Sequence, residues 1–315
     1  MQYVSLGNTG VVVSKLCFGS LTIGPLQKNL PLAEGVKILQ KAVEEGVNFV
    51  DTADLYGTYP YIREVIKTYP DLVVASKSYA YDVKTAEETL ERCLKGIGRD
   101  YVDFFLLHEQ EGPLTIKGHW EALEFFIKCK EKGIIRGVGI STHHVAAVEA
   151  AAEIEEIDVI HPIINYRGFG IVDGTLKDME RAVKKAYKAG KGIYAMKPLG
   201  GGHLISRFEQ AFEYILNFPY VHSIAVGMQR IEEVEANIKI FEQKPLSKEL
   251  IEALKGYKRQ LFIQDWCQGC GECIERCGQE ALKLNEQGKV EVDAKKCILC
   301  GYCGSACKEL AIKII

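Results

Sequence analysis

Eight of the eleven cysteines stand in two runs with the same spacing, and closely spaced thiolates are metal ligands. Each run reads C-x2-C-x2-C-x3-C, and the cysteines are Cys267, Cys270, Cys273 and Cys277, then Cys297, Cys300, Cys303 and Cys307. The apolar pair Ala281-Leu282 recurs as Ala311-Ile312, which indicates an internal duplication. In a chain without a secretory signal, clustered cysteines favour metal binding over disulfides.

Four ionisable residues follow three successive apolar runs and could together handle a proton. Asp51 ends the run 47–51, Lys77 follows 72–76, His108 follows 102–107, and Tyr56 comes five residues after Asp51. A phenol of pKa ~10 becomes a useful acid near neutrality when a cation stabilises its phenolate. Lys77 could supply that cation, with Asp51 holding Lys77 charged. Alone, each residue would be interpreted as a helix cap or a surface side chain, but together they favour a proton-transfer site.

The elements that would position these residues alternate between strands and helices. Eight apolar, β-rich runs, typical of buried parallel strands, lie at 16–19, 47–51, 72–76, 102–107, 134–140, 158–164, 192–196 and 222–226. Helical patterns separate them, such as 32–46, 174–190 and 85–98, the last opening on Thr85 and Glu88 with the spacing of a capping box. Eight such units predict an α/β fold, a closed (β/α)8 TIM barrel whose strand ends meet at one mouth. Two β-rich runs around residues 7–10 predict a hairpin that covers the barrel bottom.

The pattern changes after about residue 241. Residues 245–261 predict one helix with Ser247 as its N-cap, and the duplicated cysteine segment follows. We therefore expect two domains. The first is the barrel with its linking helix at 1–260, and the second is a small α+β domain at 261–315.

Composition excludes several classes of function. Of the 315 residues, 47% are hydrophobic and 26% are charged, and no apolar run approaches the ~20 residues of a membrane span. The 39 basic and 42 acidic residues leave a net charge of −3, too even for a nucleic-acid surface. The opening MQYVSLGNTG lacks the basic and apolar regions of a secretory signal. We expect a cytoplasmic protein that binds neither nucleic acid nor membrane.

The motifs of the first domain resemble those of the aldo-keto reductase family. LGNTGVVVSKLCFGS, DTADLYG, the strand end at Lys77, LLH and IRGVGIS form an ordered set within roughly residues 1–245. The resemblance implies a (β/α)8 barrel, a nicotinamide cofactor (NADP or NAD) and a catalytic tetrad of Asp51, Tyr56, Lys77 and His108. It also places seven residues near the cofactor, namely Ser141, Asn165, Met196, Gly200, Gly227, Arg230 and Asn237.

Three positions depart from what the family often has. Thr142 stands for an Asn, His161 is the nearest match to a Gln, and Met196 replaces an aromatic residue that stacks on the nicotinamide. A thioether can still pack on a ring. His161 is about equally well understood as a hydrogen-bonded core residue. His143 and His144 are expected to cap a helix or to face solvent.

The cysteine runs resemble those of bacterial ferredoxins with two [4Fe–4S] clusters, over about residues 262–315. In that family the fourth cysteine of each run ligates the other cluster. The resemblance implies one cluster on Cys267, Cys270, Cys273 and Cys307, and a second on Cys297, Cys300, Cys303 and Cys277. Gly278 and Lys308 replace the family's proline after each run, which leaves the ligands intact. The alternative is two four-cysteine zinc sites, although these usually pair separate C-x2-C knuckles.

Together these features predict an oxidoreductase that transfers hydride between a nicotinamide cofactor and a small carbonyl or alcohol substrate. The clusters would pass single electrons or serve as a docking point for a redox partner. Two alternatives stay open. One is a redox-sensing regulatory module with little turnover, because similar barrels form beta subunits of potassium channels. The other is a reductase whose clusters only stabilise a small domain.

Overall fold

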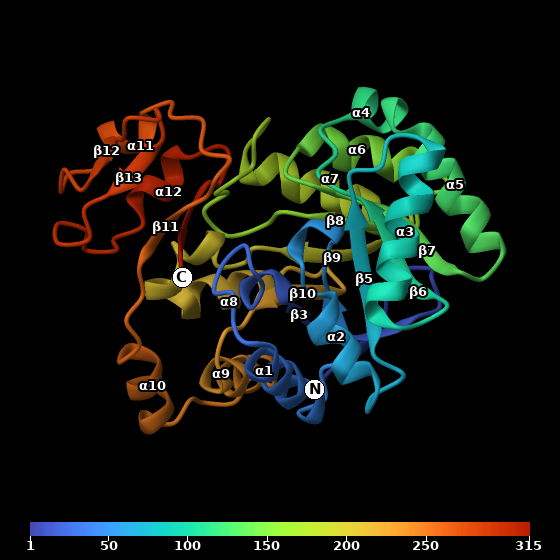
Figure 1. The fold of residues 1–315 in the computed structure, drawn as a ribbon, viewed down its shortest axis with the longest axis horizontal. Helices are drawn as coiled ribbons and strands as arrows, with labels where there is room; N and C mark the ends of the chain where they lie inside the picture. Colours follow the sequence, from blue (N-terminus) through green and yellow to red (C-terminus); the bar gives the residue numbers. More distant parts are fainter.

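The computed structural model describes residues 1–315, and its centre is a closed barrel of parallel strands (Figure 1). The strands are β3 (Leu16–Gly19), β4 (Phe49–Asp51), β5 (Val73–Ser78), β6 (Val102–Leu107), β7 (Ile135–Thr142), β8 (Val159–Pro162), β9 (Gly192–Met196) and β10 (Ser223–Gly227). Each strand pairs with the next, and β10 closes the ring on β3 with Gly227 opposite Gly19. The predicted barrel is therefore confirmed, and all eight predicted runs contain a strand.

Helices surround the barrel and cover the outer faces of its strands. They are α1 (Leu32–Glu44), α2 (Tyr59–Ile66), α3 (Val83–Ile97), α4 (Pro113–Gly118), α5 (Trp120–Glu131), α6 (Val145–Glu153), α7 (Leu176–Lys188), α8 (Phe208–Asn217) and α9 (Ile231–Phe241). Their apolar faces join the strands in one large buried core. Short 3-10 turns lie in the loops, at Ser20–Thr22 (η1), Asp54–Tyr56 (η2), Gly200–Gly202 (η3) and Ile205–Arg207 (η4). None of the helices combines the length and apolar character that a membrane crossing needs.

Helix α3 begins earlier than the sequence predicted. Its N-cap is Asp82, whose Oδ1 accepts a hydrogen bond from the Thr85 backbone N–H at 2.7 Å. The Thr85 hydroxyl lies within 3.2 Å of the Asp82 backbone N–H, so Thr85 closes the capping box and does not open it. The prediction of a box on Thr85 and Glu88 was wrong, because Asp82 supplies an equally good capping oxygen one turn upstream.

The N-terminal hairpin covers the bottom of the barrel, as predicted. It pairs β1 (Tyr3–Ser5) with β2 (Val12–Ser14) in antiparallel fashion. Leu6 and Val13 from this hairpin are buried in one cluster with Phe49 and Phe104 of the barrel interior. Gly7 has a φ of +56°, and a Cβ there would overlap the backbone of β9, so the turn lies directly on the barrel.

Residues 261–315, called here the cysteine-rich segment, follow a linking helix. That helix, α10 (Lys248–Lys255), starts at Ser247, whose Oγ accepts from the Leu250 N–H at 3.2 Å. The N-cap is as predicted, but the helix ends at Gly256 and not at 261. The segment itself pairs β11 (Leu261–Ile263) with β14 (Ile312–Ile314) and β12 (Leu282–Leu284) with β13 (Val290–Val292), and adds α11 (Glu272–Glu275) and α12 (Tyr302–Ala306).

The cysteine-rich segment packs directly on the barrel (Figure 1). Leu310 is buried in the barrel's core cluster, and a Cβ on Gly170 would overlap its side chain. The His203 Nε2 donates to the Ile312 carbonyl at 2.8 Å. The ring of His203 lies against Gly304, where any side chain would collide with it. Close contacts between backbones and small residues therefore fix β14 and α12 against the loop that follows β9.

Candidate active site and cysteine clusters

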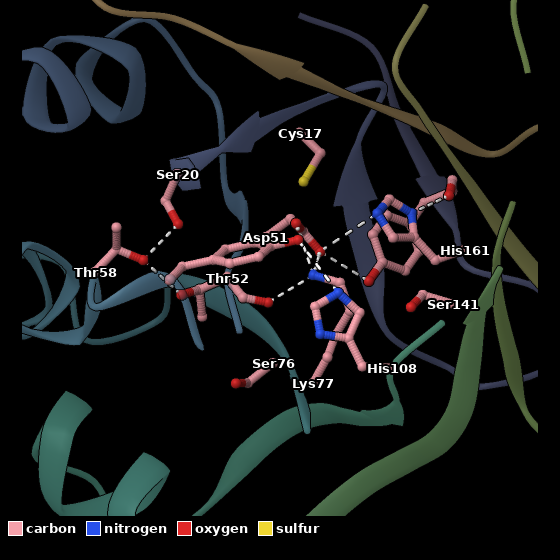
Figure 2. A network of polar contacts seen from close by, with 12 residues as sticks. Cys17, Ser20, Asp51, Thr52, Thr58, Ser76, Lys77, His108, Ser141 and His161 are labelled. Atoms are coloured by element: carbon pink, nitrogen blue, oxygen red, sulfur yellow. Dashed lines mark hydrogen bonds and ion pairs between the residues drawn. The ribbon is translucent and has the colours of Figure 1, made fainter. Parts of the chain in front are cut away.

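Strands β4 and β5 place Asp51 and Lys77 side by side at their carboxyl ends (Figure 2). The Lys77 Nζ donates to both carboxylate oxygens of Asp51, at 2.8 and 2.9 Å, and to the Thr52 carbonyl at 2.6 Å. Lys77 is 1% exposed and Asp51 is 5% exposed. All three ammonium hydrogens thus have acceptors inside the protein, which is what a buried charge requires.

Tyr56 and His108 lie above this ion pair. The Tyr56 hydroxyl is 3.5 Å from the His108 Nε2, and the Lys77 Nζ lies 4.8 Å from the centre of the Tyr56 ring. Burial raises the pKa of Tyr56 well above its usual value, and the Asp51 carboxylate raises it further. Burial, with the Lys77 charge, lowers the pKa of His108 well below its usual value. At neutral pH the phenol therefore keeps its proton and the imidazole is neutral.

The four predicted residues come together, but Lys77 does not act on Tyr56 as the sequence suggested. A lowered pKa of Tyr56 was expected from the Lys77 charge. In the structure Lys77 is fully engaged by Asp51 and Thr52, and burial dominates the pKa of the phenol. Tyr56 therefore stays protonated at rest and is ready to donate its proton.

A second layer of polar groups holds Asp51 from behind. The Tyr194 hydroxyl, from β9, donates to the Asp51 Oδ1 at 3.0 Å. The His161 ring stacks on the Tyr194 ring with centres 3.8 Å apart, and its Nδ1 donates to the Tyr194 carbonyl at 2.6 Å. The Nε2 of His161 lies 3.6 Å from the Asp51 Oδ1 (Figure 2). His161 is thus a buried residue that belongs to the network. Sequence reasoning missed Tyr194, although it lies two residues before Met196 and so on the same strand face.

A cavity of about 500 Å³ opens over the site and reaches Asp51, Tyr56 and His161. Of the seven residues predicted near the cofactor, three line it, namely Met196, Gly227 and Asn237. The other four lie outside its lining. The Ser141 Oγ accepts from the Glu109 N–H at 3.0 Å, and Asn165 bonds within its own loop to Phe169. Gly200 and Arg230 do not line the cavity either, whereas Gly201 and Gly202 do.

Several cavity residues lie beyond the motifs that the sequence offered. Gln229 is buried, and its Oε1 has no hydrogen-bond partner although the residue lines the cavity. Lys255, Tyr257 and Arg259, from the end of α10 and the chain after it, line the same cavity. The unpaired amide oxygen suits a hydrogen-bond donor on a ligand, and Lys255 adds a basic side chain to the cavity. Lys255, Tyr257 and Arg259 were missed because the linking helix and the chain after it meet α9 only in the folded protein.

The two histidines after β7 have different settings. His144 is the N-cap residue of α6 and makes no capping bond with its side chain. His143 was expected to cap a helix or to face solvent, and this was wrong. Its Nε2 lies 2.6 Å from the Nζ of Lys197, the residue after β9, so the two side chains link the ends of β7 and β9 across β8.

The eight cysteines of the cysteine-rich segment gather in two sets that cross between the runs. Burial and then the thiols of Cys307, Cys270 and Cys267 raise the pKa of Cys273 to about 11, and these four cysteines line one cavity of about 130 Å³. Burial and then Cys297, Cys300, Cys273 and Cys277 raise the pKa of Cys303 to about 12. The fourth cysteine of each run therefore lies near the other run. No three His, Cys, Asp or Glu side chains are close enough to hold a single metal ion.

Comparisons with known proteins agree with both parts. The family model described as "Aldo/keto reductase family" matches residues 15–212, and the model "4Fe-4S dicluster domain" matches residues 260–308. An uncharacterized oxidoreductase of Bacillus subtilis, YqkF, is 24% identical over 82% of this chain and 97% of its own. L-galactose dehydrogenase of Arabidopsis thaliana is 23% identical over 74% of this chain and 86% of its own.

The fold itself is shared with solved structures. The holo form of an aldo-keto reductase from Bacillus halodurans superposes with a TM-score of 0.65 at 20% identity, covering 81% of this chain and 95% of that one. The barrel, the matched families and the site geometry lead to one assignment. The chain belongs to the aldo/keto reductase family and carries a 4Fe-4S dicluster domain at its C-terminal end.

Proposed function

We propose that this protein is an NAD(P)H-dependent reductase of a small carbonyl compound, which can also run in reverse as an alcohol oxidation. The observation that carries the proposal is the buried Asp51–Lys77 ion pair beneath Tyr56, at the floor of a large cavity. A protonated phenol beside a neutral imidazole suits a carbonyl oxygen that gains negative charge and needs a proton.

The cavity fits a nicotinamide cofactor in its chemistry. The unpaired Oε1 of Gln229 and the side chain of Asn237 offer polar contacts, Gly227 leaves room for close approach, and Met196 can pack on a ring. When bound, the reduced nicotinamide supplies hydride to the carbonyl carbon.

The chain's own residues then handle the oxygen and its proton. His108 and Tyr56 orient the carbonyl oxygen, and the Tyr56 hydroxyl releases its proton to it. Lys77, fixed by Asp51, places a positive charge near the phenolate that remains. Tyr194 and His161 keep Asp51 in place from behind.

For the cysteine-rich segment we propose two [4Fe–4S] clusters, on Cys267, Cys270, Cys273 and Cys307 and on Cys277, Cys297, Cys300 and Cys303. The crossed grouping of the thiols supports this division. Cys270 and Cys300 are exposed, which gives an electron-transfer protein access to either cluster. We place this domain at 261–315 and the reductase domain at 1–260.

A direct test is anaerobic turnover of an aldehyde panel with NADPH and with NADH. A reductase consumes cofactor in proportion to aldehyde. A regulatory module that only binds the cofactor shows binding by fluorescence titration and almost no turnover, and that result would exclude the proposed activity.

We expect weak discrimination between NADP and NAD, with a slight lean to NADP. Arg230 is the only basic residue in 227–238, and it is held by Glu232 at 3.0 Å and stacks on Tyr257. Arg259, at the cavity, is held by Glu233 at 2.9 Å. Because carboxylates already occupy both guanidinium groups, a 2′-phosphate gains little from them. Fluorescence titration should give dissociation constants within about tenfold of each other.

Two variants test which residue causes the slight preference for NADP over NAD. Arg259→Ala should bring the two dissociation constants closer together, whereas Arg207→Ala, in η4 and outside the cavity lining, should leave them unchanged. A preference for NADP above about a hundredfold would show a phosphate anchor that involves neither arginine.

We also expect that the nicotinamide does not reduce the clusters directly. Leu299, between Cys297 and Cys300, lines the cavity, so this ligand loop lies at the cofactor site. Hydride nevertheless carries two electrons and each cluster accepts one, and the tetrad is built for proton and hydride transfer. Anaerobic mixing with NADPH or NADH should leave the visible absorbance and the paramagnetic resonance of the clusters unchanged. Prompt cluster reduction in flavin-free protein would contradict this expectation.

A further inference from the structure

Two lysines without anionic partners face the cavity from opposite sides of the domain boundary. Lys197 follows β9 of the barrel, and Lys313 lies in β14 of the cysteine-rich segment. Both line the cavity that reaches Tyr56. Neither ammonium has a carboxylate within 4.0 Å.

Lys313 is held in this position by the docking of its strand. It is 4% exposed, and its only close polar or aromatic partner is the face of Trp266, 5.3 Å from the Nζ. On one side Ile312 accepts the hydrogen bond from His203, and on the other the Ile314 carbonyl lies where a Cβ on Gly202 would overlap it. The strand therefore cannot move away from the barrel without breaking these contacts.

Lys197 is strained as well as charged. Its φ is +56°, a left-handed conformation that is costly for a residue with a Cβ, and its Nζ is fixed against the His143 Nε2 at 2.6 Å. Strain of this kind persists where the surrounding structure imposes it, and it often marks a binding site.

The charged groups around the pair leave a cationic space. Burial and then Lys313 lower the pKa of Lys197 to about 7, and burial lowers the pKa of Lys313 to about 8. The Lys197 charge also lowers the pKa of His108, so Lys197 lies within electrostatic reach of the tetrad. Glu109 raises the pKa of both lysines through space, but its carboxylate accepts a hydrogen bond from the Tyr79 hydroxyl and pairs with neither ammonium. Lys313 is buried and Lys197 is partly buried, so the two ammonium groups lose hydration and repel each other, and an anion would offset both costs.

We propose that Lys197 and Lys313 form a subsite for the carboxylate of the substrate, so that the protein prefers carbonyl compounds that also carry a carboxylate. The iron–sulfur domain thereby supplies a specificity-determining residue to the reductase site. This inference rests on the proposed carbonyl reduction and names its substrate class.

The test compares two aldehydes that differ only in charge, 4-formylbenzoate and its methyl ester. For the parent, kcat/KM should be higher for the acid. Lys313→Met and Lys197→Met should each lower the acid-to-ester ratio of kcat/KM by roughly 10- to 100-fold, the size of one charge-assisted hydrogen bond. Lys313→Arg should keep most of the ratio. Lys295→Met, an exposed lysine of the same segment, should not change it.

Iron content and the melting temperature show whether each variant is folded, and the Lys313→Arg protein serves as a folded reference at the same position. A ratio that stays at the parent value in both methionine variants would overturn the proposal. So would an equal loss for acid and ester with weaker NADPH binding, because the lysines would then hold the phosphates of the cofactor.

A binding measurement separates this inference from the activity itself. Calorimetry should show benzoate binding to the parent holoprotein, no binding of benzamide, and loss of benzoate binding in Lys313→Met. If no aldehyde turns over but benzoate binds in this lysine-dependent way, the carbonyl reduction fails and the anion subsite stands. If benzoate does not bind, the subsite is overturned whatever the turnover.

Discussion

Replacing Tyr56 by Phe should lower kcat for carbonyl reduction by about 10²–10⁴-fold and leave cofactor binding nearly unchanged. The substitution keeps the ring over Lys77, at 4.8 Å from its Nζ, and removes only the hydroxyl beside His108. Burial keeps this phenol protonated at neutral pH, so it holds the proton that the carbonyl oxygen needs. Asp51 is the base partner of Lys77, and His108 is neutral. Steady-state kinetics with saturating NADPH measures the effect.

The matched control for this variant is Tyr59→Phe. Tyr59 is also buried and its hydroxyl bonds to the Ser76 Oγ at 2.8 Å, but it does not line the cavity. This variant should lose some stability and keep its kcat, since a buried hydroxyl with a partner is worth about 1 kcal/mol. A Tyr56→Phe protein that turns over like the parent would show that another group donates the proton.

Cys303→Ser should remove about half of the iron, and Cys277→Ser should remove the same half although Cys277 belongs to the other run. The reason is the crossed grouping, in which Cys277 lies with Cys297, Cys300 and Cys303. Iron and sulfide analysis of anaerobically purified protein measures the loss. The folding of the segment should also weaken, because its own core contains only seven buried residues, two of which are cysteines.

Double variants distinguish crossed from uncrossed ligation. The double variant Cys277→Ser with Cys303→Ser should lose no more iron than Cys303→Ser alone, because both substitutions remove ligands of the same cluster. Cys277→Ser combined with Cys273→Ser should lose nearly all of the iron. The reverse pattern would assign each run to its own cluster, and zinc in place of iron would assign the segment to zinc sites.

Much of the fold could be predicted from the local pattern of apolar residues in the sequence. Much of the site could be predicted from the polar residues at the ends of the strands. The eight apolar runs were sufficient to predict the barrel, because short runs that are apolar on both faces and alternate with helices are typical of parallel strands. Asp51, Lys77 and His108 come together because each lies at the end of a strand of that barrel, so their convergence needs no knowledge of loops.

What the sequence did not predict depends on contacts between distant segments. Lys313 and Arg259 reach the cavity only because the cysteine-rich segment and its linker fold back on the barrel, and no periodicity encodes that docking. Tyr194 appears as an ordinary strand residue until Asp51 is placed beneath its hydroxyl. The pKa of Tyr56 depends on burial and on which acceptors engage Lys77, and both are properties of the packed site.

The burial of Leu310 in the barrel core couples the cysteine-rich segment to the barrel, and this coupling determines how exposure to dioxygen affects the protein. Dioxygen attacks iron–sulfur clusters, whereas hydride transfer to a carbonyl involves no oxygen-sensitive group. Here the strand that follows the last cluster cysteine also forms a wall of the reductase cavity, so oxidative loss of the clusters would loosen that wall. The proposed carbonyl reduction, although it involves no oxygen-sensitive group, would therefore depend on an anaerobic environment.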